Sequence, residues 1–378
     1  MSTITVKVGT TIERAKVRNM LFRNFVGALL AIGALSPGVL RAQAPNFVQT
    51  NLVSDIPGLA TITDSNLVNP WGISHAPTSP FWVSNQGTST STLYAVTNGT
   101  NIVAESLVVA IPKTAAGPQG PTGQVNNSNV SSFVLGNGRS ALFIFANLNG
   151  TISAWNLGTG TTAVIQVTTV GAVYTGLAIN GAQTRLYAAN AAQGTVDVFD
   201  SFFNPVNLGA NAFVDPSLPA GLVPFNVQEI NGDVYVVYAP AGRANQVSAS
   251  LGEGAVAVFD EDGNFIKQLV AGSRLAAPWG ITMAPPSFGR FSNHLLVGNF
   301  SYLHSEINAF DSITGNFHGT IPISAGANHP GGLWAIQFGV GGNNGSPDIL
   351  YFTDGINGER DGLFAAISPP AAAPENAQ

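Results

Sequence analysis

A four-residue motif that occurs twice sets the period of this chain. Pro70–Ile73, with the sequence Pro-Trp-Gly-Ile, returns as Pro278–Ile281, and the offset of 208 residues between the two copies equals four steps of 52. Weaker copies lie between and after them, so anchors at positions 71, 122, 175, 225, 279 and 334 follow one another at intervals of 50 to 55 residues. A fixed period of this length is typical of a protein built from structural repeats. The sequence therefore predicts six similar units.

Each unit repeats one order of short strands. An apolar strand that ends in Asn or Asp is followed by a Gly-containing turn and a second strand that often ends in Phe-Asp, as at 186–190 and 196–200. Outer strands follow Asp- and Gly-containing turns at 265–270 and 317–321. Because about fifty residues hold four short strands with their turns, each unit has the size of one propeller blade. We predict an all-β, six-bladed β-propeller, whose fourth unit carries an insertion from Gly242 to Gly254.

The two ends of the repeat region predict how the ring closes. The sixth unit has only three strands, which begin near Trp334, whereas an unassigned strand at 47–53 precedes the first unit. Pairing this N-terminal strand with the strand at 363–367 would remove two open sheet edges. We therefore expect residues 47–53 to form the outer strand of the last blade.

Composition supports the same fold class and excludes some chemistry. The 43 Gly, 23 Pro and only 9% charged residues are typical of short strands joined by tight turns. Hydrophobic residues make up 45% of the chain, which is enough for a large core. Cysteine is absent, and this excludes disulfides, thiolate-metal sites and cysteine nucleophiles.

The first 42 residues have the pattern of a signal peptide. Six basic residues and one acidic residue accompany an apolar run of 16 residues from Phe25 to Leu40. This run is shorter than the roughly 20 residues of a transmembrane helix. We expect cleavage after Ala42, with an uncleaved membrane anchor as the alternative. The predicted organisation is a signal peptide at 1–42, a propeller at 43–368 and a disordered tail at 369–378.

Charge limits the partners of the mature chain. Removal of residues 1–42 would leave 8 basic and 19 acidic residues, a net charge near −11. Such a surface repels phosphate backbones and anionic lipids, so we expect no nucleic-acid partner. We also expect no membrane span in the mature chain, and a monomer that is secreted or lies in the periplasm or cell envelope. Its partner would be a protein, a glycan or a small ligand.

The repeat unit, a Pro-x-Gly-Ile anchor with strands that end in Asn or Asp and in aromatic-Asp, resembles the NHL-type propeller repeat. Segments 50–55, 66–73, 351–359 and 361–364 together resemble a conserved hypothetical family of exported bacterial propellers, over about residues 47–368. This resemblance implies the fold and export but no established activity. Some members carry a PEP-CTERM tail for surface display. The end of this chain lacks the apolar span and basic stop of such a tail, so the resemblance does not imply surface anchoring.

The anchor loops are the first candidates for a ligand site, because ligands of propellers usually sit at a mouth of the central channel. Trp71, Trp279 and Trp334 hold equivalent positions where the innermost strands begin, and their rings could stack on a sugar or a planar ligand. The alternative is that they wedge adjacent blades together. His329, which enters the last anchor loop, is the histidine best placed to reach the same mouth.

A Gly-rich segment at 354–361 concentrates oxygen donors of the kind that Ca²⁺ or another divalent cation prefers. The candidate ligands are Asp354, Asn357, Glu359 and Asp361. Their spacing is not that of an EF-hand, and a solvated turn is the alternative. The residues that end the second strands could also ring a cation, but such short polar residues more often cap turns: Asn85, Asn147, Asn190, Asn299 and Asp354.

Two functions of different classes follow from these patterns. No nucleophile elbow, Walker loop or dinucleotide-binding fingerprint occurs in the sequence. The leading hypothesis is a non-catalytic, extracytoplasmic binding scaffold. The second is a lactonase-like or other metal-assisted hydrolase or lyase with a cation in the central channel, which rests on fold analogy alone and assigns no catalytic residue. Three or four Asp, Glu, Asn or His side chains that converge in the channel would favour the enzyme.

Overall fold

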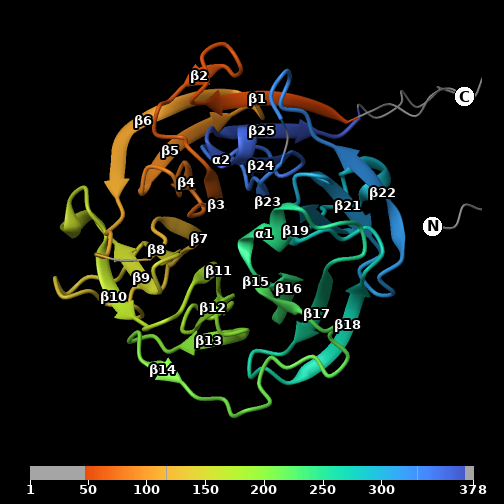
Figure 1. Cartoon of the computed structure of the whole chain (residues 1–378). Helices are drawn as coiled ribbons and strands as arrows, with labels where there is room; N and C mark the ends of the chain where they lie inside the picture. The colour runs from red at the N-terminus through yellow and green to blue at the C-terminus, as the bar shows by residue number, and fades with distance from the viewer. Residues whose placement is uncertain (1–46, 116, 330, 371–378) are drawn as a thin grey trace, which may run out of the picture. The chain divides into compact units, whose positions relative to one another are not determined.

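The computed structural model describes residues 47–115, 117–329 and 331–370, and these form the six sheets of a β-propeller (Figure 1). Five sheets have four strands and the sixth has five. In each blade one strand faces the centre of the ring, and its neighbours follow outward in antiparallel order, except that the outermost strand of the five-stranded sheet is parallel to its neighbour. The predicted all-β, six-bladed fold is confirmed. The predicted signal peptide at 1–42 and most of the predicted tail, 371–378, lie outside the described residues.

The blades follow one another in chain order, and the strands of each blade run from the centre outward as follows. Blade 1 contains β3 (Pro70–Ser74), β4 (Phe81–Asn85), β5 (Thr90–Thr97) and β6 (Asn101–Ala110). Blade 2 contains β7 (Pro121–Asn126), β8 (Phe143–Asn147), β9 (Thr151–Trp155) and β10 (Val164–Thr168). Blade 3 contains β11 (Tyr174–Ile179), β12 (Leu186–Asn190), β13 (Thr195–Phe199) and β14 (Pro205–Val206).

The second half of the ring has the same order. Blade 4 contains β15 (Leu222–Ile230), β16 (Asp233–Pro240), β17 (Ala255–Phe259) and β18 (Phe265–Ala271). Blade 5 contains β19 (Pro278–Met283), β20 (Leu295–Asn299), β21 (Glu306–Phe310) and β22 (Phe317–Pro322). Blade 6 contains β23 (Leu333–Phe338), β24 (Leu350–Asp354), β25 (Leu363–Ser368), β1 (Val48–Ser54) and β2 (Ile62–Thr63).

Helical turns occupy a few of the connecting loops. The helices are α1 (Arg243–Val247) and α2 (Ile356–Glu359), and two 3₁₀ turns cover Leu157–Thr159 and Gly289–Phe291. The helix α1 lies within the insertion predicted for the fourth unit. Among the described residues, no helix has the length and apolar character needed to cross a membrane.

The N-terminal strand closes the ring as predicted. β1 pairs antiparallel with β25 along its whole length, from Val48 opposite Ser368 to Ser54 opposite Leu363. Val53 is fully buried in this arrangement. The two-residue strand β2 pairs parallel with the end of β1 and was not predicted, because a strand so short carries no alternation to recognise.

Glycine sets the distance between neighbouring inner strands. Gly72, Gly123, Gly176 and Gly280 each follow an anchor residue, and a Cβ atom at any of them would overlap atoms of the next inner strand. At Gly72 that Cβ would lie 2.5 Å from the carbonyl oxygen of Thr122. The anchors were expected in loops, but they lie in the buried first halves of the inner strands, where backbone pairing with the second strands holds them. The repeated glycine is therefore a packing requirement.

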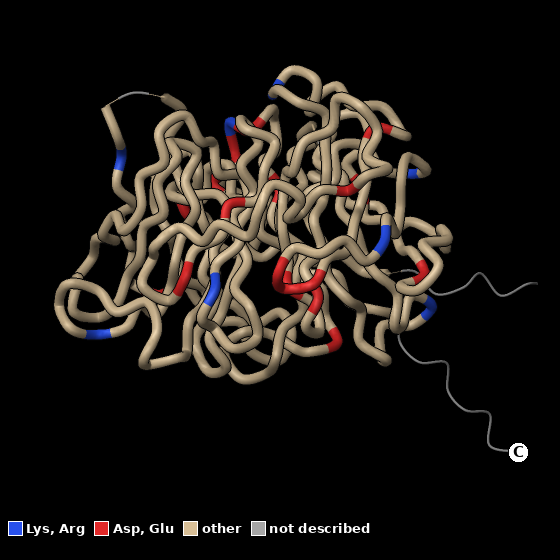
Figure 2. The backbone as a smooth tube through the Cα atoms, turned by 90° about the horizontal axis from the view of Figure 1, so that it is seen from below, with Lys and Arg blue, Asp and Glu red and all other residues tan. Residues whose placement is uncertain are grey.

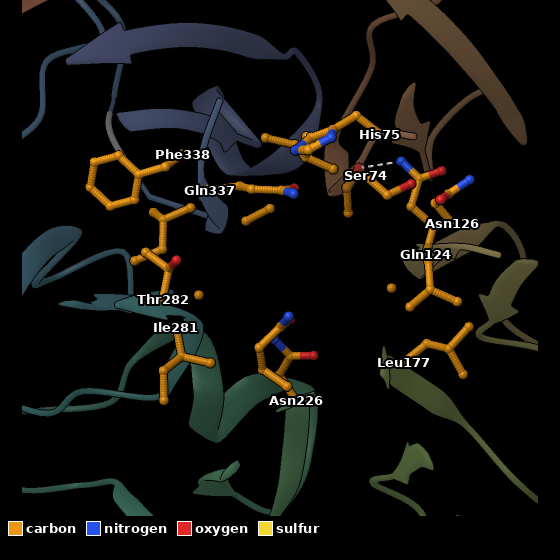
Figure 3. Close-up of a pocket in the computed structure, with 18 of the residues that line it drawn as sticks. Ser74, His75, Gln124, Asn126, Leu177, Asn226, Ile281, Thr282, Gln337 and Phe338 are labelled. Atoms are coloured by element: carbon orange, nitrogen blue, oxygen red, sulfur yellow. Dashed lines mark hydrogen bonds between the residues drawn. The ribbon is translucent and has the colours of Figure 1, made fainter. Parts of the chain in front are cut away.

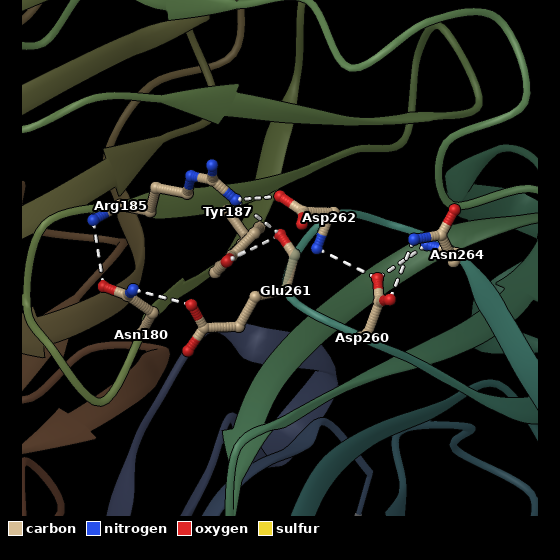
Figure 4. A network of polar contacts seen from close by, with 7 residues as sticks. All are labelled: Asn180, Arg185, Tyr187, Asp260, Glu261, Asp262 and Asn264. Atoms are coloured by element: carbon tan, nitrogen blue, oxygen red, sulfur yellow. Dashed lines mark hydrogen bonds and ion pairs between the residues drawn. The ribbon is translucent and has the colours of Figure 1, made fainter.

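A polar network connects blades 3 and 4 through the β11–β12 loop and the β17–β18 turn (Figure 4). Arg185 forms an ion pair with Asp262 at 2.7 Å, and the backbone carbonyl of Glu261 accepts hydrogen bonds from Arg185 and Tyr187, both at 3.0 Å. The Glu261 carboxylate accepts a further hydrogen bond from Asn180 at 2.9 Å. Because Asp262 is largely exposed, this ion pair contributes little stability, about 0–1 kcal/mol, and mainly fixes the position of the β17–β18 turn.

Replacement of Gly123 by alanine should destabilise the ring, because the added methyl group would meet backbone atoms of β11. Overpacking of this kind typically lowers the free energy of unfolding by about 1–3 kcal/mol. Urea denaturation of the Gly123→Ala variant measures this loss. Gly181→Ala is the matched control, since no atom lies within 4 Å of its added Cβ. Equal stability of the two variants would contradict the packing role.

Candidate functional site

Aromatic rings fill the channel at the end where the inner strands begin. Trp71 and Trp334 stack with ring centroids 3.4 Å apart, and the ring of Trp279 stands edge-on to both, at 6.2 and 5.6 Å. All three side chains are buried, with at most 4% of their surface exposed. Phe225 and Phe300 pack against Trp334 at 5.8 and 4.3 Å. The three tryptophans thus pack on one another across blades at a closed end, and their ligand-binding role stays a prediction.

A cavity of about 430 Å³ lies at the other end, where the inner strands finish (Figure 3). Residues of all six inner strands line it, together with residues that follow β3, β11 and β23. Its volume falls in the range of small-molecule sites. Trp279 reaches the wall of this cavity, whereas Trp71 and Trp334 are not part of the lining.

Neutral hydrogen-bonding groups supply the polar part of the lining. Figure 3 shows Asn226 and Gln337 pointing into the opening from blades 4 and 6. Five carboxamides of the inner strands contribute, which are Gln124, Asn126, Asn226, Gln228 and Gln337. The described residues of the lining include no Asp, Glu, Lys or Arg. Apolar side chains complete the wall, among them Leu177 and Ile281.

The carboxamides differ in how many hydrogen bonds they already make within the protein. The Gln124 amide donates to the carbonyl oxygens of Gly72 and Trp82 at 2.9 and 2.5 Å, so it ties blade 2 to blade 1. Asn226 likewise donates to the carbonyl of Trp279 at 2.8 Å. The half-buried side chain of Gln337 makes no hydrogen bond to another described residue. Gln228 is exposed and likewise makes no side-chain hydrogen bond to another described residue, so Gln337 and Gln228 are the amides most available to a ligand.

One titratable side chain belongs to the lining. Burial lowers the pKa of His75 below its ordinary value, although hydrogen bonds to backbone carbonyls of Ala76 and Phe338 act in the opposite direction. Its imidazole is consequently neutral at pH 7. The whole described lining is then uncharged, and its polar groups both donate and accept hydrogen bonds.

The four predicted metal ligands do not converge on one point. Asn357 donates to Asp361 at 2.8 Å, whereas Glu359 accepts hydrogen bonds from Arg243 and from Tyr302. Asp354 is buried at the end of β24 with 1% of its surface exposed. No group of three or more His, Asp or Glu side chains suited to a metal ion occurs in the described part of the chain. Bound cations stay a prediction.

Two of the asparagines that end the second strands hold the chain that enters their blade, whereas Asn85 and Asn147 donate to side chains of the third strand. Asn299 accepts a hydrogen bond from the backbone of Ala276 at 3.0 Å, and Asn190 accepts one from Val173 at 3.3 Å. Each therefore links its strand to the chain that enters the same blade. Asp354 holds the equivalent position in blade 6, but neither of its carboxyl oxygens has a hydrogen-bond partner among the described residues.

His329 lies on the surface, away from the cavity. Its backbone N–H donates to the Asn357 side chain at 3.1 Å, and its carbonyl accepts from the backbone of Asn357 at 3.1 Å. The structure thus pairs His329 with the segment 354–361 through its backbone. The predicted ligand-binding role of its imidazole stays a prediction.

Sequence reasoning missed the residues of the cavity. Gln124, Asn226 and Gln337 stand at different distances from their anchors, so no repeat signal marks them. The available signal was a carboxamide within an otherwise apolar inner strand, as in 333–338. Such a residue is costly to bury without hydrogen bonds, so it points to an internal contact or to a ligand.

Comparison with known proteins supplies relatives but no activity. No family model matches the chain. It is 28% identical to uncharacterized protein R648 of Acanthamoeba polyphaga mimivirus, over 96% of this chain and 90% of that protein. It is 29% identical to uncharacterized protein L690 of the same virus, over 84% of each. Because these relatives are viral, a bacterial source and NHL-like repeats stay predictions.

Two solved structures are weakly similar. Kuenenia stuttgartiensis hydrazine synthase matches with a TM-score of 0.49 and 15% identity, over 80% of this chain and 79% of that one. A Bacteroides thetaiotaomicron protein of unknown function matches with a TM-score of 0.49 and 10% identity, over 80% of this chain and 70% of that one. Likenesses at this level carry no information about function.

Replacement of Asp354 by asparagine should stabilise the protein at neutral pH. Burial raises the pKa of Asp354 well above its ordinary value. The folded state therefore favours the neutral carboxyl. Its contribution to the free energy of unfolding is fully present below about pH 4 and is lost as the pH rises toward the pKa of the folded state. Urea denaturation should show that Asp354→Asn is more stable than wild type at pH 7.5, and that this difference is smaller at pH 4. A pH-independent difference between the two proteins would contradict this assignment.

Proposed function

We propose that this chain is a non-catalytic binding scaffold that holds a neutral, hydroxyl-rich ligand, such as a mono- or oligosaccharide, in the cavity at the ends of the inner strands. The observation that carries the proposal is the uncharged, carboxamide-rich lining of that cavity. Carboxamides donate and accept hydrogen bonds, as sugar hydroxyls do. The apolar side chains between them suit the C–H faces of a sugar ring.

The chemistry of the lining also disfavours charged ligands. A charged group that entered this cavity would lose water without meeting an opposite charge in the described lining, which is unfavourable. The chain as a whole has 20 acidic and 14 basic residues, and the charged residues of the propeller are spread thinly around it (Figure 2). An anionic ligand would therefore gain no general attraction either. The hydrolase or lyase alternative gains no support from this lining, because it brings no carboxylate to the channel.

The proposal includes export. The basic N-terminus and the apolar run from Phe25 to Leu40 support a cleaved signal peptide, and the acidic remainder of the chain suits a soluble protein in the cell envelope or outside the cell. The resemblance to exported bacterial propellers supports the same location. We propose that the mature protein acts as a monomer.

Cleavage after Ala42 predicts the first residue of the mature protein. Expression of the full chain in a Gram-negative host should yield an extracytoplasmic protein whose N-terminal sequencing begins at Gln43. A full-length protein that stays bound to the inner membrane would contradict export by cleavage.

Loss of the Gln337 amide should weaken saccharide binding. A glycan array first identifies the best-bound neutral saccharide, and titration calorimetry then compares wild type with Gln337→Ala. Because one hydrogen bond to a neutral group contributes about 0.5–1.5 kcal/mol, we expect a three- to tenfold higher Kd.

Gln166→Ala is the matched control, since Gln166 lies on the exposed outer strand β10. It should leave the Kd unchanged. Three results would contradict the proposal: no neutral glycan binds, the two variants bind alike, or the bound saccharide is turned over.

A further inference from the structure

A second cluster of side chains lies at the end of the channel where the inner strands begin. There the insertion in blade 4 forms α1, near the centre of the ring in Figure 1. Its Arg243 lies over two aromatic rings, with the guanidinium carbon 4.1 Å from the centroid of Phe300 and 5.4 Å from that of Trp334. Both distances are within the range of cation–π attraction.

Two other blades supply groups that face the same guanidinium. Arg243 forms an ion pair with Glu359 of α2, and the hydroxyl of Tyr302 donates to the same carboxylate at 3.1 Å. Glu359 has a φ of 64°, a left-handed conformation that residues with a Cβ atom adopt uncommonly. Its side chain is only 15% exposed. The turn thus holds a carboxylate against the aromatic rings.

This cluster has an acceptor that the described residues do not satisfy. Oε1 of Glu359 is buried without a hydrogen-bond partner among the described residues. Burial raises the pKa of the Tyr302 hydroxyl, and the positive charge of Arg243 acts in the opposite direction. A buried acceptor without a donor lowers stability, and a ligand with several N–H groups would satisfy it.

We propose that Trp334, Phe300, Tyr302 and Glu359, which we call the cation site, bind a guanidinium-bearing ligand, and that Arg243 occupies this site as an internal competitor. The ligand is free arginine or an arginine side chain of a peptide. The cation site lies at the opposite end of the channel from the saccharide cavity, so the two proposals stand or fall separately.

The chemistry of the site favours a guanidinium over an ammonium. A guanidinium is planar, stacks on aromatic faces and carries five N–H donors that fit carboxylates two at a time. An ammonium is compact and strongly hydrated, so it gains less from the rings. Arg243, with its own guanidinium, already shows that this group fits.

The Arg243 side chain is also positioned so that it can leave the cation site. Its side chain is 41% exposed, and it is the first residue of a five-residue helix with no side-chain hydrogen bond at its N-cap. A helix this short has little stability of its own. The later part of the insertion is held instead, because Ser301 donates to the carbonyl of Ala249 at 2.6 Å. The first turn can therefore move while the rest of the insertion stays in place.

Titration calorimetry with methylguanidinium tests the proposal. Arg243→Ala should bind it at least tenfold more tightly than wild type, because the competitor is gone. The added substitution Glu359→Gln should weaken this binding at least tenfold. Methylurea, a neutral analogue of similar shape, should not bind. Titrations with L-arginine and with the peptide Gly-Arg-Gly then show which source of the guanidinium binds more tightly.

Arg185→Ala is the matched control, since it also removes a guanidinium from an ion pair, but on blade 3, where its partner is Asp262 and not the Glu359 carboxylate of the cation site. It should gain no methylguanidinium binding. If Arg243→Ala does not fold, Arg243→Met keeps the apolar packing of the stem and takes its place. The proposal is overturned if these Arg243 variants bind no better than Arg185→Ala, or if methylurea binds equally well.

Discussion

The six inner strands approach one another so closely at the channel axis that four of them require glycine next to the anchor residue. Where Gly72 and Gly280 stand, any side chain would overlap the neighbouring strand. This close approach brings Trp71 and Trp334 into stacking contact and seals one end of the channel with aromatic rings. Toward the other ends of these strands, the space between them becomes the cavity. The position of the candidate site thus follows from the packing of the anchors.

The sequence predicts the ring well because the features that build it repeat. The Pro-Trp-Gly-Ile motif gives the number of blades, and the count of strands in the last unit gives the pairing of β1 with β25. Both inferences need only the period and the physical cost of open sheet edges. The insertion in blade 4 was also visible as an interruption of the repeat, although its short helix was not.

The site could not be predicted in the same way, since it depends on where individual side chains point. Trp71 and Trp334 stack on each other across two blades, and nothing in the linear sequence indicates this contact. Asp354 and Glu359 are near one another in the sequence, yet a left-handed turn at Asn357 and Gly358 lies between them. A linear spacing of oxygen donors does not record that turn. Gln337 carries no repeat signal at all.

The two ends of the channel differ in chemistry, and we therefore propose a different ligand for each end. One end offers neutral amides around a cavity, whereas the other holds aromatic rings and the Glu359 carboxylate around Arg243. A ligand of one kind has little to gain at the other end. The propeller therefore presents two distinct surfaces on one rigid ring.

Hydrogen–deuterium exchange with and without a bound neutral saccharide tests whether the saccharide occupies the cavity, because it shows which segments of the chain the ligand protects. If the saccharide binds in the cavity, the last residues of the inner strands and the loops that follow them are protected, notably 72–76, 123–127 and 336–340. We expect no protection of the insertion at 242–254. Protection confined to that insertion and to 355–361 would contradict binding in the cavity, since the saccharide would then occupy the opposite end of the channel.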